Sequence, residues 1–276
     1  INEVLDTQPH IREGRETSGR ETSTVEFRDV SFRYPNAAGN ELEHISFRVG
    51  RGQTLAVIGA TGSGKSTLVS LIPRFYDATE GSVLVDGVDV KEYTFDTLYN
   101  KLGYVTQKAV LFSGTVRENV FFGESAAQNT DASLSAALQL SQANEFVSRY
   151  PEGAAHPIAQ LGRNVSGGQK QRLSIARALA RNPEILVFDD SFSALDYRTD
   201  AALREGLARE LPDTTKIIVA QRISTIRHAD QILVLDRGEL VGHGTHDELM
   251  KTCRVYQEIA LSQLSAEELA EGGDCK

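Results

Sequence analysis

The sequence predicts an α/β fold with a mostly parallel core sheet and an antiparallel part contributed early in the chain. Residues 54–58, 185–188 and 217–219 are apolar throughout, as expected of strands buried on both faces of a sheet. Residues 25–32 and 45–49 instead alternate apolar and polar side chains, which predicts strands with one solvated face. Helical segments between the apolar strands complete the alternation that is typical of this class.

The first half of the chain is predicted to alternate short strands with helices. A helix over residues 65–75 follows the buried strand at 54–58. Short apolar segments at 83–85 and 103–105 predict two further strands. Between residues 132 and 147, apolar side chains at helical spacing, with alanines between them, favour helices.

The second half of the chain carries clearer signals for where its elements end. Residues 166–181 predict a helix that Asn182 and Pro183 terminate. The two remaining buried strands follow, and residues 232–241 have the pattern of a hairpin.

The bulk composition is that of an ordinary globular protein. The chain has 276 residues, of which 40% are hydrophobic and 24% charged. A net charge of −9 argues against a surface for nucleic acid, so we expect no nucleic-acid partner, and it gives no support to a polybasic membrane anchor. Two cysteines, Cys253 and Cys275, make no disulfide framework, and the cytoplasm is the default compartment.

The domain organisation is predicted from changes in composition. Residues 1–23 read as a polar connector, residues 24–264 as one folded domain, and residues 265–276 as a flexible tail rich in Glu and Gly. No apolar run approaches the length needed to cross a bilayer, and no signal peptide is visible. Since the sequence starts at Ile1 and its only methionine is Met250, we expect it to be a piece of a longer protein.

A phosphate-binding loop follows the first buried strand. Gly59, Gly64, Lys65 and Ser66 meet the pattern G-x-x-x-x-G-K-[ST], with a strand before it and a helix after it. Glycines let successive backbone N–H groups point at phosphate oxygens, and the helix N-terminus adds the positive end of its dipole. The residues expected to bind the nucleotide are Gly59, Thr61, Gly62, Ser63, Gly64, Lys65, Ser66 and Thr67. The alternative is a glycine-rich turn that matches by chance.

A magnesium site is predicted beside this loop. Lys65 supplies a mobile charge, and the hydroxyl of Ser66 is a suitable ligand for Mg²⁺. Asp189 ends the buried strand at 185–188 and would hold the same ion through water. The alternative role for Asp189 is to cap the next turn. The predicted ligands are therefore ATP and Mg²⁺.

A third motif lies between these two in the sequence. Residues 164–172 resemble the LSGGQ signature of ATP-binding cassette (ABC) proteins, with Val165 at its first position. Ser166 and Gln169 have the spacing of a capping box, and a helix N-terminus beside Gly167 and Gly168 is a second place for an anion. With all three motifs in order, residues 25–264 resemble an ABC nucleotide-binding domain. The resemblance implies a P-loop NTPase fold with an antiparallel β subdomain and an α-helical signature subdomain.

The resemblance also implies roles for individual residues. Tyr34 matches the aromatic position that stacks on adenine, although a tyrosine that packs at a strand end is the alternative. Gln107 matches the glutamine that reaches Mg²⁺, and Asp196 belongs to the D-loop at residues 193–196. The implied magnesium ligands are Ser66, Gln107 and Asp189.

Two further stretches are similar to ABC exporters. Residues 110–119 match the region that receives the coupling helices of the membrane domain. Residues 3–6 are similar to the segment that joins the last transmembrane helix to the cassette. The resemblance therefore implies a transmembrane domain upstream on the same chain and a place at the cytoplasmic face of the cell membrane.

Two catalytic positions depart from the family pattern. Asp190 stands where hydrolytic cassettes carry Glu, and Gln221 stands where they carry the switch His. A general base must approach the attacking water to about 2.6–3.2 Å, and Asp is one methylene shorter than Glu. A misplacement of about 1 Å costs on the order of 100-fold in rate. We expect a degenerate site that holds ATP and hydrolyses it poorly; the alternative is an active site with unusual residues.

These departures predict the partner. In ABC dimers each ATP lies between the Walker motifs of one cassette and the signature of the other, so a homodimer would have two impaired sites. The signature at 166–169 is nearly intact, and we therefore expect a heterodimer with a subunit that carries the consensus Glu and His. The alternatives are an active homodimeric exporter, an importer ATPase subunit, and a soluble ABC ATPase. Drug, lipid or peptide export all fit the sequence.

Overall fold

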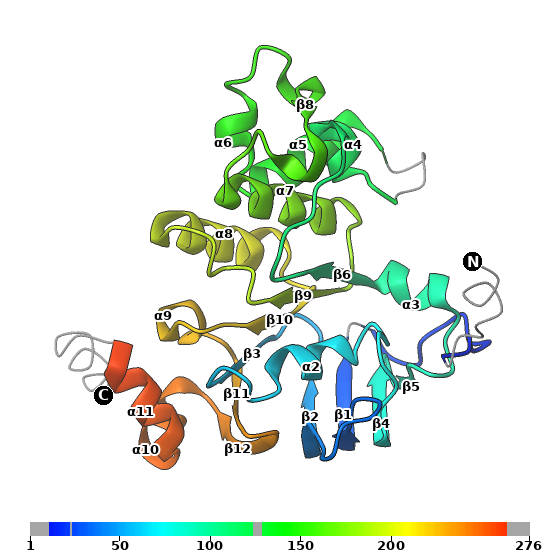
Figure 1. Ribbon diagram of the computed structural model, residues 1–276, viewed down its shortest axis with the longest axis vertical. Helices are drawn as coiled ribbons and strands as arrows, with labels where there is room; N and C mark the ends of the chain where they lie inside the picture. The colour runs from blue at the N-terminus through cyan, green and yellow to red at the C-terminus, as the bar shows by residue number, and fades with distance from the viewer. Residues whose placement is uncertain (1–10, 23, 124–128, 264–276) are drawn as a thin grey trace.

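The computed structural model describes residues 11–22, 24–123 and 129–263 (Figure 1). A six-stranded sheet with the order β12-β11-β3-β10-β9-β6 forms its centre. All neighbours in this sheet are parallel except the hairpin of β11 and β12, which confirms the predicted mostly parallel core. The strands are β3 (Thr54–Gly59), β6 (Leu102–Val105), β9 (Ile185–Asp189), β10 (Thr215–Val219), β11 (Gln231–Asp236) and β12 (Glu239–Gly244).

The early antiparallel part is a separate sheet with the order β2-β1-β4-β5. Its strands are β1 (Val25–Phe32), β2 (Leu42–Val49), β4 (Glu80–Val85) and β5 (Val88–Asp89). It shares a hydrophobic core with one face of the central sheet, to which Leu55 and Val57 of β3 contribute. The alternate residues of β3, Ala56 and Ile58, belong to the core on the other face. The period of two in a strand thus explains why β3 is apolar throughout.

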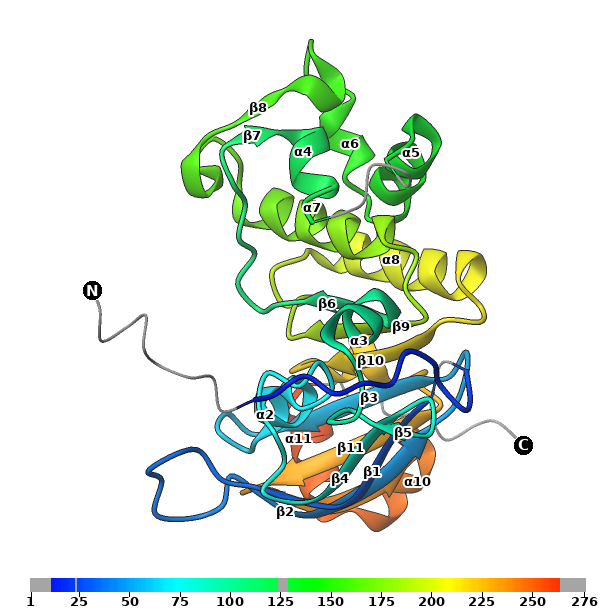
Figure 2. The same ribbon diagram turned by 90° about the vertical axis from the view of Figure 1, so that its right-hand side faces the viewer.

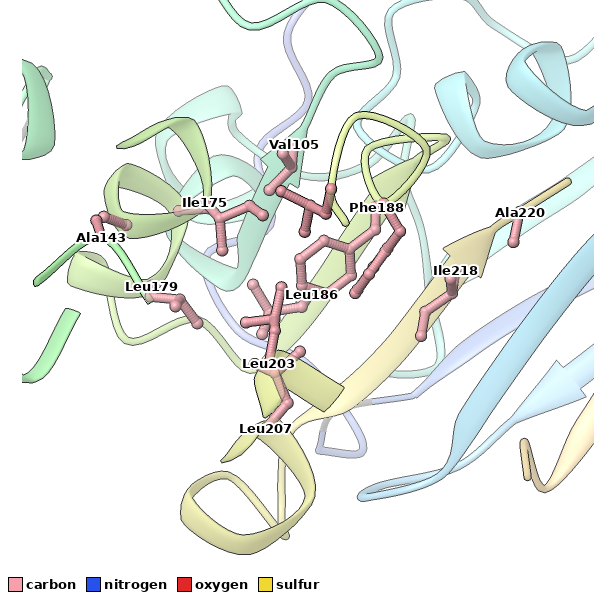
Figure 3. Packing of buried hydrophobic residues seen from close by; sticks show 14 of the residues in the cluster. Val105, Ala143, Ile175, Leu179, Leu186, Phe188, Leu203, Leu207, Ile218 and Ala220 are labelled. Carbon is pink, nitrogen blue, oxygen red and sulfur yellow. The ribbon is translucent and has the colours of Figure 1, made fainter. Parts of the chain in front are cut away.

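Helices cover that second face of the central sheet. Figure 3 shows Ile175 and Leu179 of α7 and Leu203 of α8 around Leu186 and Phe188 of β9. The helices on this side are α4 (Val116–Val120), α5 (Asp131–Leu140), α6 (Asn144–Val147), α7 (Gly167–Ala180) and α8 (Tyr197–Glu210). In Figure 1, α4, α5, α6 and β8 (Pro157–Ile158) lie beyond α7, on its side away from the sheets. The chain here also contains β7 (Gly114–Thr115), which pairs with β8, and the turns η2 (Gly153–Ala155) and η3 (Gln160–Gly162).

The last part of the described chain closes the other end of the domain. Its helices are α9 (Ile223–Ile226), α10 (His246–Thr252) and α11 (Arg254–Gln263). Tyr256 of α11 is fully buried and holds the helix against the core. Among the described residues, no helix combines the length and the apolar character that a membrane span requires.

One predicted helix is too long. The structure has α2 (Lys65–Ser70), whereas the sequence predicted a helix over 65–75. Pro73 has no backbone N–H, so the carbonyl of Val69 loses its helical donor and accepts from Ile72 instead, at 3.3 Å. The turn then ends at Arg74, whose φ is 58°. The other predicted strands, helices and hairpin are confirmed within a few residues of their bounds.

Residues 11–22 lie against the domain beside β5 and α3 (Phe95–Lys101) (Figure 2). The N–H of Gly14 donates to the carbonyl of Tyr93 at 3.0 Å, and the N–H of Thr94 donates back to Glu16 at 3.0 Å. The amides of Arg20 and Glu21 both donate to the carbonyl of Asp86. The rest of the predicted connector and the predicted tail at 265–276 lie outside the described residues.

Candidate functional site

The glycine loop joins β3 to α2. Gly62 has a φ of 80° and Gly64 a φ of 96°, values that favour glycine, so the loop needs both residues to turn before the helix. Gly59 pairs with Leu235 of β11, and a Cβ at Gly59 would overlap the Leu235 carbonyl oxygen. The loop therefore requires glycine at position 59 because a side chain would clash there, and at position 64 because of the backbone conformation.

The side chain of Lys65 curls back over this loop. Its Nζ donates to the carbonyls of Gly59 at 2.9 Å and Ala60 at 2.7 Å. Burial lowers the pKa of Lys65, although the nearby charges of Asp190 and Asp189 act in the opposite direction. The loop thus carries a partly desolvated positive charge on its concave side, as phosphate binding requires.

Ser66 and Asp189 meet at the start of α2. The Ser66 hydroxyl donates to Oδ1 of Asp189 at 2.8 Å, and the Tyr104 hydroxyl donates to Oδ2 at 3.4 Å. Burial raises the pKa of Asp189, and these two hydrogen bonds oppose that shift. Burial and the charge of Asp189 likewise raise the pKa of Tyr104 above its usual range. Tyr104 was not foreseen as a site residue, because a tyrosine in a strand usually indicates packing.

The oxygen atoms of Ser66 and Asp189 fit Mg²⁺. A hydroxyl and a carboxylate are hard oxygen donors, and Mg²⁺ is usually held by one or two carboxylates together with substrate phosphates and water. Within the described part of the chain, no group of three or more His, Cys, Asp or Glu residues could hold a metal ion by itself. An ion at this place would therefore depend on the phosphates of the nucleotide.

Asp190 contacts two other predicted residues of the site, Gln107 and Gln221. Its Oδ2 accepts a hydrogen bond from Nε2 of Gln107 at 3.0 Å and one from Nε2 of Gln221 at 2.6 Å. The Asp190 residue is only 6% exposed, and its backbone N–H donates to Val219 at 3.1 Å. We call the Gln107–Asp190–Gln221 group the amide clamp. In it Gln107 is turned toward Asp190, and not toward the Ser66–Asp189 pair.

A cavity of about 200 Å³ opens over these groups. Its lining residues are Glu41, Thr61, Gly62, Ser63, Gly64, Lys65, Ser66, Thr67, Gln107, Asp190, Val219 and Gln221. The predicted loop residues from Thr61 to Thr67 therefore share one cavity with the amide clamp, whereas Gly59 does not line it. Glu41 was not foreseen, because it enters from the segment before β2 and belongs to none of the motifs.

Tyr34 lies beside the glycine loop. Its hydroxyl is 2.9 Å from Oγ1 of Thr67, and its ring packs edge-on against Phe32 and Tyr76, with centroids 4.8 and 5.2 Å away. These contacts fit the packing role that the sequence left open, and stacking on adenine stays a prediction. Contact with Phe32 and Tyr76 orients the ring, and the hydroxyl ties it to α2.

The signature residues lie at the start of α7 and do not line this cavity. The side chain of Ser166 accepts from the N–H of Gln169, and Oε1 of Gln169 accepts from the N–H of Ser166 at 2.9 Å, so the predicted capping box is confirmed. Gly167 and Gly168 form the first helical turn. A Cβ at Gly168 would stand 3.4 Å from the carbonyl oxygen of Ala194, which places the signature next to the D-loop.

The D-loop connects the amide clamp to α8. Oγ of Ser193 donates to the Asp190 carbonyl at 2.7 Å, and the Arg222 guanidinium donates to the carbonyls of Ser193 and Leu195. Asp196 caps α8 by accepting from the N–H of Thr199 at 2.9 Å, and hydrogen bonds from Thr199 lower the pKa of Asp196. The same guanidinium lies over the ring of Tyr197, 5.9 Å from its centroid. Arg222 was not foreseen, because it belongs to none of the motifs.

Known proteins resemble this chain in sequence and in fold. Residues 42–193, more than half of the chain, match the family model described as ABC transporter. An uncharacterized ABC transporter ATP-binding protein of Bacillus subtilis, YfiB, is 44% identical over 267 residues, which cover 97% of this chain and 46% of that protein. An ATP-dependent lipid A-core flippase of Aromatoleum aromaticum is 41% identical over 273 residues, 99% of this chain and 45% of the flippase.

A putative multidrug export ATP-binding/permease protein of Bacillus subtilis, YgaD, is 45% identical over 235 residues, which cover 85% of this chain and 40% of that protein. The structure of a bacterial Atm1-family ABC exporter with ATP bound matches with a TM-score of 0.88 at 35% identity, over 95% of this chain and 46% of the exporter chain. The chain spans about half the length of the curated relatives it matches. It has the P-loop NTPase fold of an ABC ATPase and belongs to the ABC transporter family.

Proposed function

We propose that this chain is the cassette of a heterodimeric ABC exporter that binds MgATP at a degenerate, slowly hydrolysing site. The amide clamp is the observation that carries the proposal. A general base needs a free carboxylate oxygen directed at the attacking water. In Asp190, two amide hydrogen bonds to Oδ2 fix the orientation of the carboxylate, and the side chain is one methylene shorter than that of Glu.

Gln221 strengthens this argument. The neutral amide of Gln221 neither gains nor loses a proton near neutral pH. Its bond to Asp190, at 2.6 Å, is the shorter of the two in the clamp. The clamp therefore favours retention of bound ATP over proton transfer to the carboxylate, and the bound ATP would hold two cassettes together.

The partner is proposed from the position of the signature. Ser166 to Gln169 lie away from the chain's own cavity, on a helix start that the capping box keeps ordered. Such a signature would complete the nucleotide site of a second subunit, which carries the consensus Glu and His. A homodimeric exporter in which both sites work despite Asp190 remains the competing function.

We propose a transmembrane domain on the basis of the similar proteins. The names of similar proteins include a lipid A-core flippase and a putative multidrug export protein, each about twice as long as this chain. We place the cassette at the cytoplasmic face of a membrane, joined to a transmembrane domain of the same protein. Export of lipids or drugs is the proposed class of transport.

The test compares ATP turnover of the full chain with that of two variants. Asp190→Glu together with Gln221→His is expected to raise steady-state ATP turnover on the order of 100-fold. The longer Glu side chain brings the carboxylate within reach of the attacking water, and the second change removes the hydrogen bond that Gln221 donates to it. Asp190→Glu alone is expected to gain less, since Gln221 still occupies the carboxylate. Binding of MgATP should be similar in all three proteins. Wild-type turnover as fast as that of the double variant would contradict a degenerate site.

A further inference from the structure

Tyr104 reaches the site from the edge strand of the central sheet. In the parallel ladder of β6 and β9, Tyr104 pairs with Val187 and Val105 pairs with Phe188. Tyr104 therefore lies two residues along the ladder from Asp189, the last residue of β9 and part of the predicted magnesium site. Its hydroxyl donates to Oδ2 of Asp189 at 3.4 Å.

We infer that Tyr104 is a positioning residue for Asp189, the carboxylate that faces Mg²⁺ in the proposed MgATP site, on which this inference rests. Asp189 is only 9% exposed, so water can replace a lost partner only in part. Ser66 donates to one of its carboxylate oxygens and Tyr104 to the other. Two donors on opposite oxygens fix the plane of the carboxylate, and such outer partners orient metal ligands.

The ring of Tyr104 is held so that its hydroxyl stays in place. Phe75, in the turn after α2, packs edge-on against it with ring centroids 5.3 Å apart. Tyr104 also helps line a cavity of about 330 Å³, together with Phe112, Phe122 and Arg177. Removal of the whole ring would enlarge that cavity, whereas removal of the hydroxyl leaves the packing intact.

The experiment measures binding of a fluorescent ATP analogue to the full chain, once with Mg²⁺ and once with EDTA. Tyr104→Phe is expected to weaken binding with Mg²⁺ about 10-fold. This is the low end of the usual effect of removing a group that orients a metal ligand, because the hydrogen bond from Tyr104 is long. Binding in EDTA is expected to equal that of the wild type. Tyr99→Phe is the matched control, because Tyr99 is 39% exposed on α3 and stacks only on Phe95.

A second variant tests the ring. Phe75→Ala keeps the Tyr104 hydroxyl but removes its support, and a smaller loss of affinity with Mg²⁺ alone is expected. Equal binding of wild type and Tyr104→Phe with Mg²⁺ would overturn the inference, and so would an equal loss with Mg²⁺ and with EDTA. A wild-type chain whose binding does not respond to Mg²⁺ would overturn the proposed function itself, which separates the two failures.

Discussion

Ser166 acts both on the stability of the chain and on its proposed partner. Its side chain caps α7, which carries much of the core over β9. Ser166→Ala is expected to lower the free energy of unfolding by about 1 kcal/mol, the usual cost of a lost N-cap. Chemical denaturation followed by circular dichroism measures this change.

Thr245 offers a matched control for Ser166. It caps α10 with the same capping box, and Thr245→Ala should cost a similar free energy. Only Ser166→Ala should also slow ATP turnover in the proposed heterodimer, because Ser166, and not Thr245, belongs to the signature that we propose serves the partner's nucleotide. Equal turnover of the two variants would show that the signature of this chain is not used.

Individual residues differ in how far the sequence could place them. The capping box of Ser166 and Gln169 is local, and spacing alone predicts its geometry. The amide clamp joins Asp190 to Gln107, 83 residues earlier, and to Gln221, 31 residues later. The sequence identifies Gln107 as a match to the family's glutamine, and Asp190 and Gln221 as departures from the family pattern. The convergence of two amides on one oxygen depends on how β6, β9 and β10 align, and no spacing encodes that.

The glycine loop depends on the pairing of two strands. A side chain at position 59 would meet the Leu235 carbonyl and force β3 away from β11. Gly59→Ala is therefore expected to lower the free energy of unfolding by about 3 kcal/mol, at the upper end for overpacking. Thermal unfolding of the two proteins measures the difference.

Gly39 is the control for this glycine. Nothing lies within 4 Å of a Cβ placed there, and its backbone does not require glycine, so Gly39→Ala should leave stability almost unchanged. A Gly59→Ala protein as stable as Gly39→Ala would contradict the close approach of β3 and β11.

Helices and strands were mostly predictable where side-chain patterns determine them. The buried strands were found because apolar side chains on both faces leave a continuous run. The end of α2 was missed because apolar periodicity continues through Leu71 and Ile72, while the break depends on the absent N–H of Pro73. A backbone hydrogen bond that cannot form outweighs the side-chain pattern.

Across the whole molecule, Asp86 joins parts that are distant in the sequence. It is fully buried, accepts from the N–H of Thr24 at 2.8 Å, and pairs with Lys101 at 2.8 Å. Lys101 also pairs with Glu184 at the start of β9, at 3.2 Å. Lys101→Met leaves Asp86 buried without its cation and should cost about 3 kcal/mol of unfolding free energy.

The pH dependence of this cost has a definite sign. Burial lowers the pKa of Lys101, but the hydrogen bond and charge of Asp86 outweigh burial and raise it. A raised pKa in the folded state stabilises the protein fully below the unfolded value, about 10.4 for Lys, and this contribution is lost at higher pH. The difference between wild type and Lys101→Met should stay constant from neutral pH to about 10 and shrink above it.

Urea unfolding at several pH values measures that difference. Glu184→Gln is the control, because Glu184 is 39% exposed and such pairs contribute at most about 1 kcal/mol. A constant difference that persists far above the pKa of Lys would contradict the ion pair as its origin.

The docking of residues 11–22 could not be predicted from the sequence. The segment is polar and lacks periodicity, and it joins the domain through backbone hydrogen bonds at Gly14, Glu16, Arg20 and Glu21. A hydrogen bond between main-chain groups can form with almost any side chains, so it leaves almost no sequence pattern from which the docking could be predicted. Gly14 and Gly19, where a Cβ would overlap Glu92 and Asp86, carry residue-specific requirements. Glu13 carries another, because its carboxylate accepts from the N–H of Phe95 at 2.9 Å.

This docked segment has a mechanical consequence. Its hydrogen bonds to Asp86, Glu92 and Tyr93 lie in succession along the chain, so a pull directed along the segment loads them in shear, several at once. Asp86 in turn pairs with Lys101, which also pairs with Glu184, the residue before β9. Force applied at residue 11 is therefore resisted by several main-chain hydrogen bonds together before any one of them can open.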